Sequence, residues 1–303
     1  MGINRYNLKK WYKMLTGKSI LHVNQGLGKN FSTKEITGYY NDLTDKVLRD
    51  EGHIDEVDYL PVTETENGEQ VYFPIAIFQY GLACYDCYLT SKESKYLDKF
   101  FTCVKWAEQN QNINGSYNTF FFNHPDAPYS AMAQGEAASL LLRAFVQTGE
   151  EKYKIAAKLA VDYMLKSLED GGVSDYSNGG ICLLEYTNQP PVMNGWIFAL
   201  FGLYDAVLCT GEQRYIESFA RSVETLKERL PLYDNGYWTK YDDKKRIASP
   251  FYHNLHIAQM KALYLITEDE IFDQYSYKWE KYQKNPINKT RAFIKKAIQK
   301  IRE

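Results

Sequence analysis

The stretch Thr148-Gly-Glu-Glu-Lys-Tyr153 decides the fold, because the chain repeats it as Thr210-Gly-Glu-Gln-Arg-Tyr215. Two looser copies extend the series, Thr90-Ser-Lys-Glu-Ser-Lys-Tyr96 and Thr267-Glu-Asp-Glu-Ile-Phe272, and successive threonines are 58, 62 and 57 residues apart. Each copy follows an apolar-rich stretch and precedes an amphipathic one. We expect the threonine to end one helix and to cap the next, whose first turn carries acids. The pattern predicts a helical hairpin of about 60 residues that occurs four times.

The residues after Thr148 show the periodicity of an amphipathic helix. Their apolar side chains recur at spacings of three and four, at Tyr153, Ala156, Ala157, Ala160, Tyr163 and Met164. A single hairpin cannot bury its apolar face, so repeated hairpins stack on one another. We therefore expect a mainly α protein, an incomplete α/α toroid of about four helical hairpins with β-hairpin inserts, over residues 71–283.

The segments outside and between the hairpins differ in composition. Glycine-rich stretches such as Gly171-Gly172 and Asn235-Gly236 separate the hairpins. Because such loops all emerge at the same end of a helical toroid, we expect a binding or catalytic site to open at that end. Residues 1–70 are expected to form an N-terminal segment with a β-hairpin that turns at Asn67-Gly68. Residues 284–303 follow a basic amphipathic pattern, which predicts a terminal helix with weak contact to an anionic membrane face.

Composition narrows the function classes. The 303 residues include 36 Lys and Arg and 38 Asp and Glu, which gives a net charge of −2. The chain as a whole therefore lacks the excess of positive charge that is typical of nucleic-acid-binding proteins. The 15 Phe, 5 Trp and 26 Tyr suit a cleft that stacks on sugars. The sequence has no signal-peptide pattern, no run of 18 apolar residues and five scattered cysteines, so we expect a cytoplasmic protein, peripheral to the inner face of the membrane.

Motifs for metals and cofactors are weak or missing. Cys84-Tyr-Asp-Cys87 lies in an apolar helix without a βαβ unit or a second pair, so core packing is the better interpretation. His253 and His256 share a helix face but have no third ligand nearby. The sequence has no P-loop, no dinucleotide fingerprint and no nucleophile elbow. We expect neither a metal nor a cofactor.

Several motifs, in order along residues 57–283, resemble the C-terminal domain of D-glucuronyl C5-epimerases, which convert D-glucuronate to L-iduronate within heparan-type chains. They are Phe73-Pro-Ile-Ala-Ile-Phe-Gln-Tyr-Gly-Leu82, Tyr129-Ser-Ala-Met-Ala-Gln-Gly135, Leu184-Glu-Tyr186, Asn194 to Asp205, Leu230-Pro-Leu-Tyr-Asp234 and Tyr252-His-Asn-Leu-His-Ile257. The resemblance implies an α/α toroid, an acidic-sugar cleft and a homodimer.

The resemblance also implies a catalytic set of one glutamate and several tyrosines, which falls on Glu185, Tyr186, Tyr241 and Tyr252. Two departures bear on specificity. Animal members usually carry Arg shortly after the tyrosine that matches Tyr241, where this chain has Asp243-Lys244. Their large N-terminal β-domain is reduced here to about seventy residues.

The proposed chemistry suits these residue types. Inversion at C5 of a uronate needs one acid/base group on each side of the ring and donors aimed at the charged carboxylate. Glu185 is a candidate base for one face and Tyr241 for the other, with Tyr252 and Tyr186 holding or relaying protons. Candidate substrate contacts are Gln134, Asn194, Lys244 and His253.

The sequence therefore favours a cofactor-independent isomerase that epimerises glucuronate in a heparosan-like acidic polysaccharide or oligosaccharide. Three alternatives stay open. A uronate polysaccharide lyase would abstract the same proton and then expel the 4-O-linked sugar. A non-catalytic module would only bind acidic glycan during polysaccharide assembly. A glycoside hydrolase would need two carboxylates across the cleft, and only Glu185 has motif support.

Overall fold

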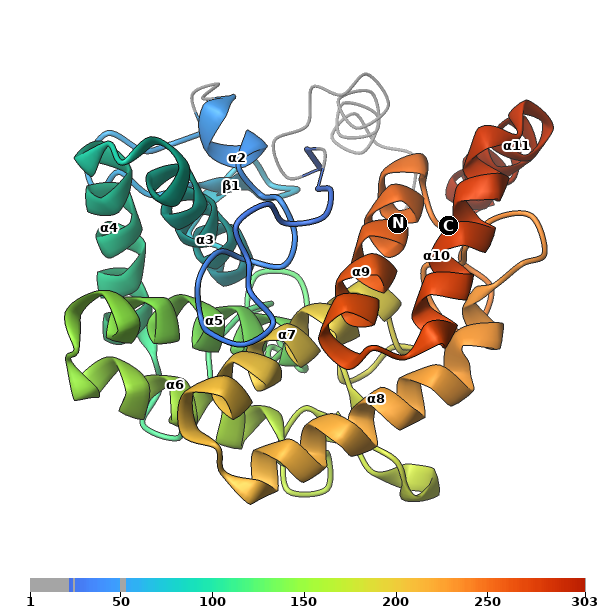
Figure 1. Ribbon diagram of the computed structural model, residues 1–303. Helices are drawn as coiled ribbons and strands as arrows, with labels where there is room; N and C mark the ends of the chain where they lie inside the picture. Colours follow the sequence, from blue (N-terminus) through green and yellow to red (C-terminus); the bar gives the residue numbers. More distant parts are fainter. Residues whose placement is uncertain (1–21, 24, 50–52, 303) are drawn as a thin grey trace.

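The computed structural model of the protein describes residues 22–23, 25–49 and 53–302. Four helical hairpins form its body (Figure 1): α3 (Pro74–Ser91) with α4 (Ser94–Asn110), α5 (Ala131–Thr148) with α6 (Glu151–Met164), α7 (Met193–Thr210) with α8 (Gln213–Tyr233), and α9 (Pro250–Thr267) with α10 (Glu270–Lys284). The first helix of each pair is the more buried one, and consecutive first helices pack together, α3 on α5, α5 on α7 and α7 on α9. The fold is an incomplete α/α toroid, as the repeat predicts.

Each hairpin turns at the repeated threonine, but the threonine does not cap the second helix. Thr148 is the last residue of α5, where its hydroxyl donates to the Ala144 carbonyl and accepts from the Glu150 N–H. Glu150 then occupies the N-cap position of α6 without a side-chain bond. Gly149 makes the reversal at φ 74°, a left-handed conformation that glycine adopts without steric cost. The expected threonine cap is therefore wrong, and the hydroxyl instead closes the first helix.

The two central helices approach each other unusually closely. A Cβ on Gly202 of α7 would lie only 2.1 Å from the Gly135 carbonyl oxygen of α5. The missing side chains thus let the two backbones touch, which fixes the inner wall of the toroid. α7 is long and apolar enough to cross a membrane, but 72% of that stretch is buried inside the fold. It is a core helix of the toroid.

The strands are short and lie outside the helical body. β1 (Thr63–Glu64) pairs antiparallel with β2 (Gln70–Val71), and β3 (Ser174–Asp175) with β4 (Cys182–Leu183). The first pair is the expected Asn67-Gly68 hairpin, with Gly68 at φ 83°, and the second lies in the glycine-rich insert. β2 spans the boundary that we expect between the N-terminal segment (residues 1–70) and the toroid (residues 71–283). The division of the chain into these two parts and a C-terminal helix (residues 284–303) stays a prediction.

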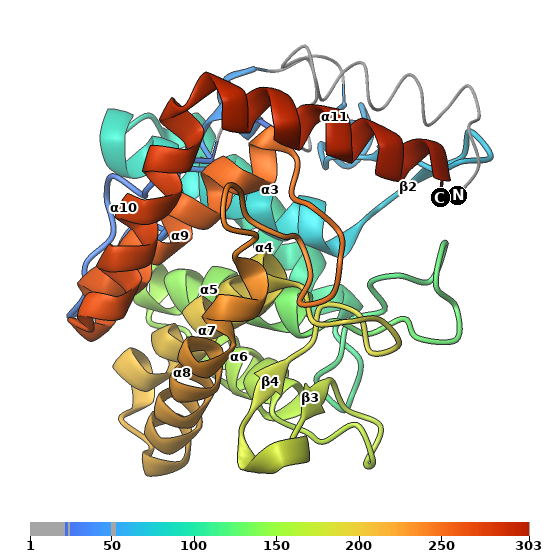
Figure 2. The ribbon, with the colours of Figure 1, turned by 90° about the vertical axis from the view of Figure 1, so that its right-hand side faces the viewer.

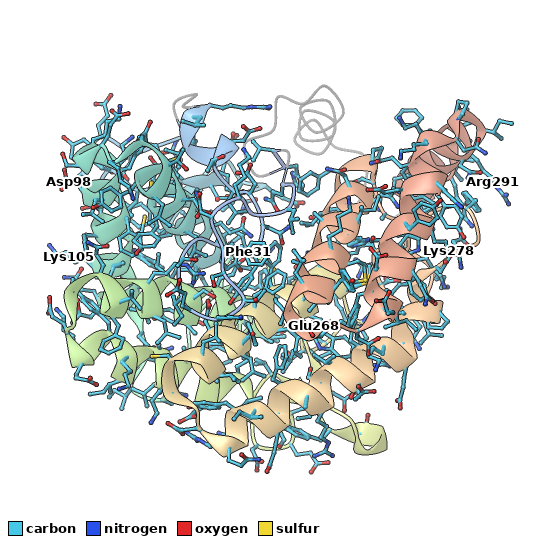
Figure 3. All side chains as sticks on the ribbon, viewed as in Figure 1. Phe31, Asp98, Lys105, Glu268, Lys278 and Arg291 are labelled. Carbon is cyan, nitrogen blue, oxygen red and sulfur yellow. The ribbon has the colours of Figure 1, made fainter. Side chains whose placement is uncertain are left out.

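The segment before α3 lies against the toroid through a buried polar network. It includes α2 (Asp45–Leu48), and in Figure 1 it crosses in front of α5 and α7. The buried Arg143 guanidinium of α5 donates to Asp205 of α7 at 2.7 Å and to the Gly38 carbonyl at 2.7 Å, and the Tyr40 hydroxyl donates to the same Asp205. These bonds attach residues 38–40 to the inner helices, while Phe31 packs beside Tyr40 with ring centroids 5.4 Å apart (Figure 3).

The last helix, α11 (Pro286–Arg302), runs along the outside of the molecule (Figure 2). Its buried Ala292 packs on a small second core made by Tyr237, Trp238, Ile247 and Ala248. This core belongs to the loop between α8 and α9. The loop carries Tyr241 and Arg246, so the terminal helix supports a candidate site residue.

Candidate active site

A cavity of about 550 Å³ opens at the N-terminal ends of all four inner helices. Its walls come from the first turns of α3, α5, α7 and α9, from the Glu185-Tyr186 end of the insert, from residues 120–124 and from the N-terminal region at residues 22–25 and 63–67. Helix N-termini carry partial positive charge and unpaired N–H groups. Within residues 22–23, 25–49 and 53–302, no side chain caps α3 or α7. A cavity built this way is suited to an anionic ligand.

Glu185 presents a buried carboxyl to this cavity. Its side chain is 6% exposed, and Oε2 accepts no hydrogen bond from the residues that the structure describes. Burial raises the pKa of Glu185 to about 7, against the opposing effects of the Tyr186 hydroxyl and the Arg246 charge. Such a carboxyl can take and return a proton near neutral pH.

Gly195, in the first turn of α7, makes the room for this carboxyl. A Cβ there would lie 2.4 Å from the Glu185 Oε2 atom and 2.6 Å from its Cβ, well inside van der Waals contact. The absence of a side chain at this position lets Glu185 lie against the start of the helix, where the helix dipole favours its ionised form. The helix start and the insert together fix its position.

Three tyrosines surround Glu185. Tyr186 stacks on Phe120 with centroids 4.4 Å apart and lines the cavity, as Tyr252 does. Tyr241 lies behind Tyr252, edge-on, with centroids 4.7 Å apart. Burial and the Glu185 charge raise the pKa of all three phenols. Each therefore carries its proton as a hydrogen-bond donor at neutral pH.

Arg246 supplies the positive charge of the site. Its guanidinium pairs with Asp242, donates to Gln189 and lies 5.0 Å from the ring centroid of Tyr241. Its charge lowers the pKa of Glu185 and of the three phenols, although burial outweighs this effect. The sequence analysis missed Arg246, although the Arg expected after Tyr241 was the available signal. Here it follows at the fifth position, beyond Asp243-Lys244.

Other cavity residues also escaped the sequence analysis. His22 Nε2 lies 3.3 Å from the Tyr252 hydroxyl, and His124 packs edge-on against Tyr186 with centroids 5.5 Å apart. Gln79 lines the cavity and donates to Glu136 at 2.7 Å. These residues come from distant parts of the chain, and no local pattern distinguishes them.

The predicted substrate contacts divide into two groups. Asn194 lines the cavity, and its buried Oδ1 accepts no hydrogen bond from the described residues. Lys244 is exposed in the loop after Tyr241 and is not among the residues lining the cavity. Two further candidates are buried in the protein interior instead.

The structure corrects the expectation for Gln134 and His253. The Gln134 side-chain amide donates to the carbonyls of Gly115 and Ala160 and accepts from the Tyr117 N–H. These bonds join α5 to α6 and to the loop that precedes α5. His253 stacks on Trp238 at 3.6 Å and bonds to Thr239 and to the Trp279 carbonyl, and burial lowers its pKa to about 3. Both side chains satisfy buried polar groups, and His253 also holds the loop that carries Tyr241 through Trp238 and Thr239, so neither is free to contact a substrate.

Metal-binding side chains are scarce in the described part of the chain. No group of three or more His, Cys, Asp or Glu side chains there could hold a metal ion. Cys84 and Cys87 are buried free thiols in α3, and burial raises the pKa of both. They pack in the core, and neither is a reactive thiolate.

The sequence of residues 107–281, more than half of the chain, matches the family model described as the C-terminus of D-glucuronyl C5-epimerase. The chain belongs to the D-glucuronyl C5-epimerase family. It is 29% identical over 223 residues to the D-glucuronyl C5-epimerase of Caenorhabditis elegans, covering 64% of this chain and 36% of that protein. The resemblance inferred from the ordered motifs is confirmed.

One further sequence relative and one solved structure show how far the similarity extends. An uncharacterised protein of Methanocaldococcus jannaschii is 33% identical over 155 residues, 49% of this chain and 50% of that one. The chain thus spans about a third to a half of these relatives. An inactive variant of the alpha-1,6-mannanase of Salegentibacter sp. HEL1_6, solved with alpha-1,6-mannotriose, has a similar structure with a TM-score of 0.50 at 15% identity, over 71% of this chain and 64% of that one. This likeness shows a shared fold alone.

Proposed function

We propose that this protein inverts C5 of D-glucuronate residues in a heparosan-like acidic glycan, giving L-iduronate by proton removal and return, without a cofactor. Membership of the epimerase family supports an isomerase that acts on uronates. The observation that carries the finer proposal is the buried Glu185 carboxyl, with its pKa raised to about 7, beside Tyr186 and Tyr252 at the cavity wall.

The first step is removal of the C5 proton. Glu185 acts as the base: its Oε2, which accepts no hydrogen bond from the described residues, lies at the cavity beside Gly195, and its pKa of about 7 suits proton transfer near neutral pH. Tyr241 acts on the opposite face of the sugar ring through Tyr252, which lines the cavity and meets the Tyr241 ring edge-on. One group receives the proton from C5, and the other donates a different proton to the far side, so the product differs only in configuration.

The intermediate places extra negative charge on the uronate carboxylate. The uncapped first turns of α3 and α7 and the Arg246 guanidinium provide the positive potential that stabilises it. The Asn194 Oδ1, which accepts no hydrogen bond within the described part of the chain, is an acceptor for a sugar hydroxyl. The cavity thus combines a base, phenol donors and an anion-stabilising end, which is the set that C5 inversion requires.

The test is incubation of heparosan with the parent protein and with Glu185→Gln, an uncharged variant of nearly equal volume. The proposal expects iduronate in the product of the parent, an unchanged chain length and loss of conversion in the variant. An unsaturated product, seen as new ultraviolet absorbance with shorter chains, would assign a lyase instead. Binding of heparosan without either product would identify a glycan-binding module.

A further inference from the structure

The outward face of α11 is apolar although the helix is firmly packed on its other side. Ile287 is 74% exposed, Ile294 52% and Ile298 44%. Spacings of seven and four residues place the three side chains on one stripe. Phe293, which lies about 100° around the helix from Ile294, is 47% exposed. Exposed single hydrophobic residues are ordinary, but an aligned stripe on one helix indicates a surface that docks on something.

The charged residues of the helix itself, residues 286–302, are all of one sign. Residues 286–302 contain no Asp or Glu and six bases, at Lys289, Arg291, Lys295, Lys296, Lys300 and Arg302. Arg291 and Lys295 are exposed and flank the isoleucines, and Figure 3 shows Arg291 at the periphery of the molecule. The whole chain carries a net charge of −2, so this basic helix is a local feature and does not follow from overall composition.

The opposite face of α11 holds the loop of the candidate active site. The Lys296 ammonium donates to the Ile247 carbonyl at 2.8 Å, and the Gln299 amide bonds to the Lys245 carbonyl at 2.7 Å and accepts from the Ile247 N–H at 3.0 Å. These bonds bracket Arg246. The helix is therefore fixed to the body, and among the described residues the isoleucine stripe belongs to neither hydrophobic core.

The chemistry of the stripe favours a lipid surface over the other occupants. An amphipathic helix with an apolar face and flanking Lys and Arg lies in the interface of an anionic bilayer, where each base near the surface contributes about 1 kcal/mol. Protein interfaces are depleted in Lys. A track for acidic glycan would need bases and aromatic rings but no isoleucine stripe.

We propose that α11 binds the surface of an anionic membrane through Ile287, Ile294 and Ile298 and their flanking bases. The opposite face then holds the Tyr241–Arg246 loop within about one helix diameter, roughly 10 Å, of that surface. The binding does not depend on the reaction proposed above.

The experiment is sedimentation of the full chain with vesicles of phosphatidylcholine alone or of an equimolar mixture with phosphatidylserine. The parent is expected to bind the mixed vesicles, to release from them as salt rises, and to bind phosphatidylcholine weakly. Ile294→Glu with Ile298→Glu should weaken binding at least about tenfold, because it removes apolar area and adds like charge to the lipid. Ile155→Glu is the matched control, since Ile155 on α6 is 58% exposed and should leave binding unchanged.

Equal sedimentation of the parent and the double variant would overturn the proposal, as would absence of binding to the mixed vesicles. Loss of a dimer in the double variant, measured by light scattering without a change in vesicle binding, would assign the stripe to a second copy of the chain and overturn it also. Conversion of soluble heparosan without vesicles is measured in parallel. Failure of the epimerase proposal would therefore show separately from failure of this one.

Discussion

The substitution Gly195→Ala tests whether the position of Glu185 sets the rate. The added Cβ would lie 2.4 Å from Oε2 of Glu185, whereas ordinary van der Waals contact begins near 3.4 Å, so the carboxyl must retreat by about 1 Å. The Glu185 Cβ, at 2.6 Å, is also too close, so rotation of the carboxylate end alone does not relieve the overlap. Moving a catalytic group by about 1 Å costs on the order of 100-fold in rate, which corresponds to about 2.7 kcal/mol of barrier.

The same substitution should change stability much less. Overpacking costs about 1–3 kcal/mol, and replacing a helical glycine by alanine returns up to about 1 kcal/mol. The net loss of about 0–3 kcal/mol leaves a folded protein with its melting temperature lowered by a few degrees. The assay is heparosan turnover, with circular dichroism melting on the same samples.

Gly26→Ala is the control for the effect of a methyl group as such. A Cβ at Gly26 meets no atom within 4 Å, so this variant should keep the parent's rate. Parental turnover by a folded Gly195→Ala variant would refute the reasoning, because the structure leaves no room for that Cβ with Glu185 in place. Equal losses in the two variants would refute it as well.

Three further predictions concern charge and protons at the site. Glu185→Gln and Tyr241→Phe should differ in which epimer exchanges its C5 hydrogen with D2O, and equal loss from both epimers in each variant would exclude two bases on opposite faces. Because folding raises the pKa of Glu185 from 4.5 to about 7, the parent should lose stability relative to Glu185→Gln as pH rises through that window. Urea titrations should show the free energy of unfolding falling by about 3 kcal/mol across this window. No such fall would occur if the Glu185 carboxyl titrated near 4.5 in the folded state. Arg246→Gln removes a charge that lowers the Glu185 pKa. The acid limb of the pH–rate profile should therefore move to higher pH by as much as about one unit. The control Arg214→Gln, which removes a charge from the surface, should leave the acid limb where it is in the parent.

The sequence predicted the four hairpins because their signal is local and repeated. A threonine with acids after it marks each turn, and the apolar periodicity on either side defines the helices. The same pattern did not show which residue caps the second helix. The Thr148 hydroxyl bonds both backward to the Ala144 carbonyl and forward to the Glu150 N–H, and with the left-handed turn at Gly149 between the helices the N-cap position falls on Glu150.

The site was predictable only where ordered motifs pointed to it. Glu185, Tyr186 and Tyr252 came from the resemblance, and the structure places all three at one cavity. Gln134 has the same polar character in the sequence, yet it bonds to backbone groups in the interior. Arg246 reaches Tyr241 because the loop folds back on itself, through the bond from the Tyr241 N–H to the Arg246 carbonyl. Single-sequence patterns carry no information on such contacts.

The central claim is that this protein removes and replaces the C5 proton of a uronate without breaking the chain. Proton NMR of heparosan incubated with the protein in D2O measures this directly. The account predicts loss of the C5 proton signal as deuterium enters, appearance of iduronate and an unchanged polymer length. Retention of the C5 proton throughout, with the folded protein bound to the glycan, would contradict the account.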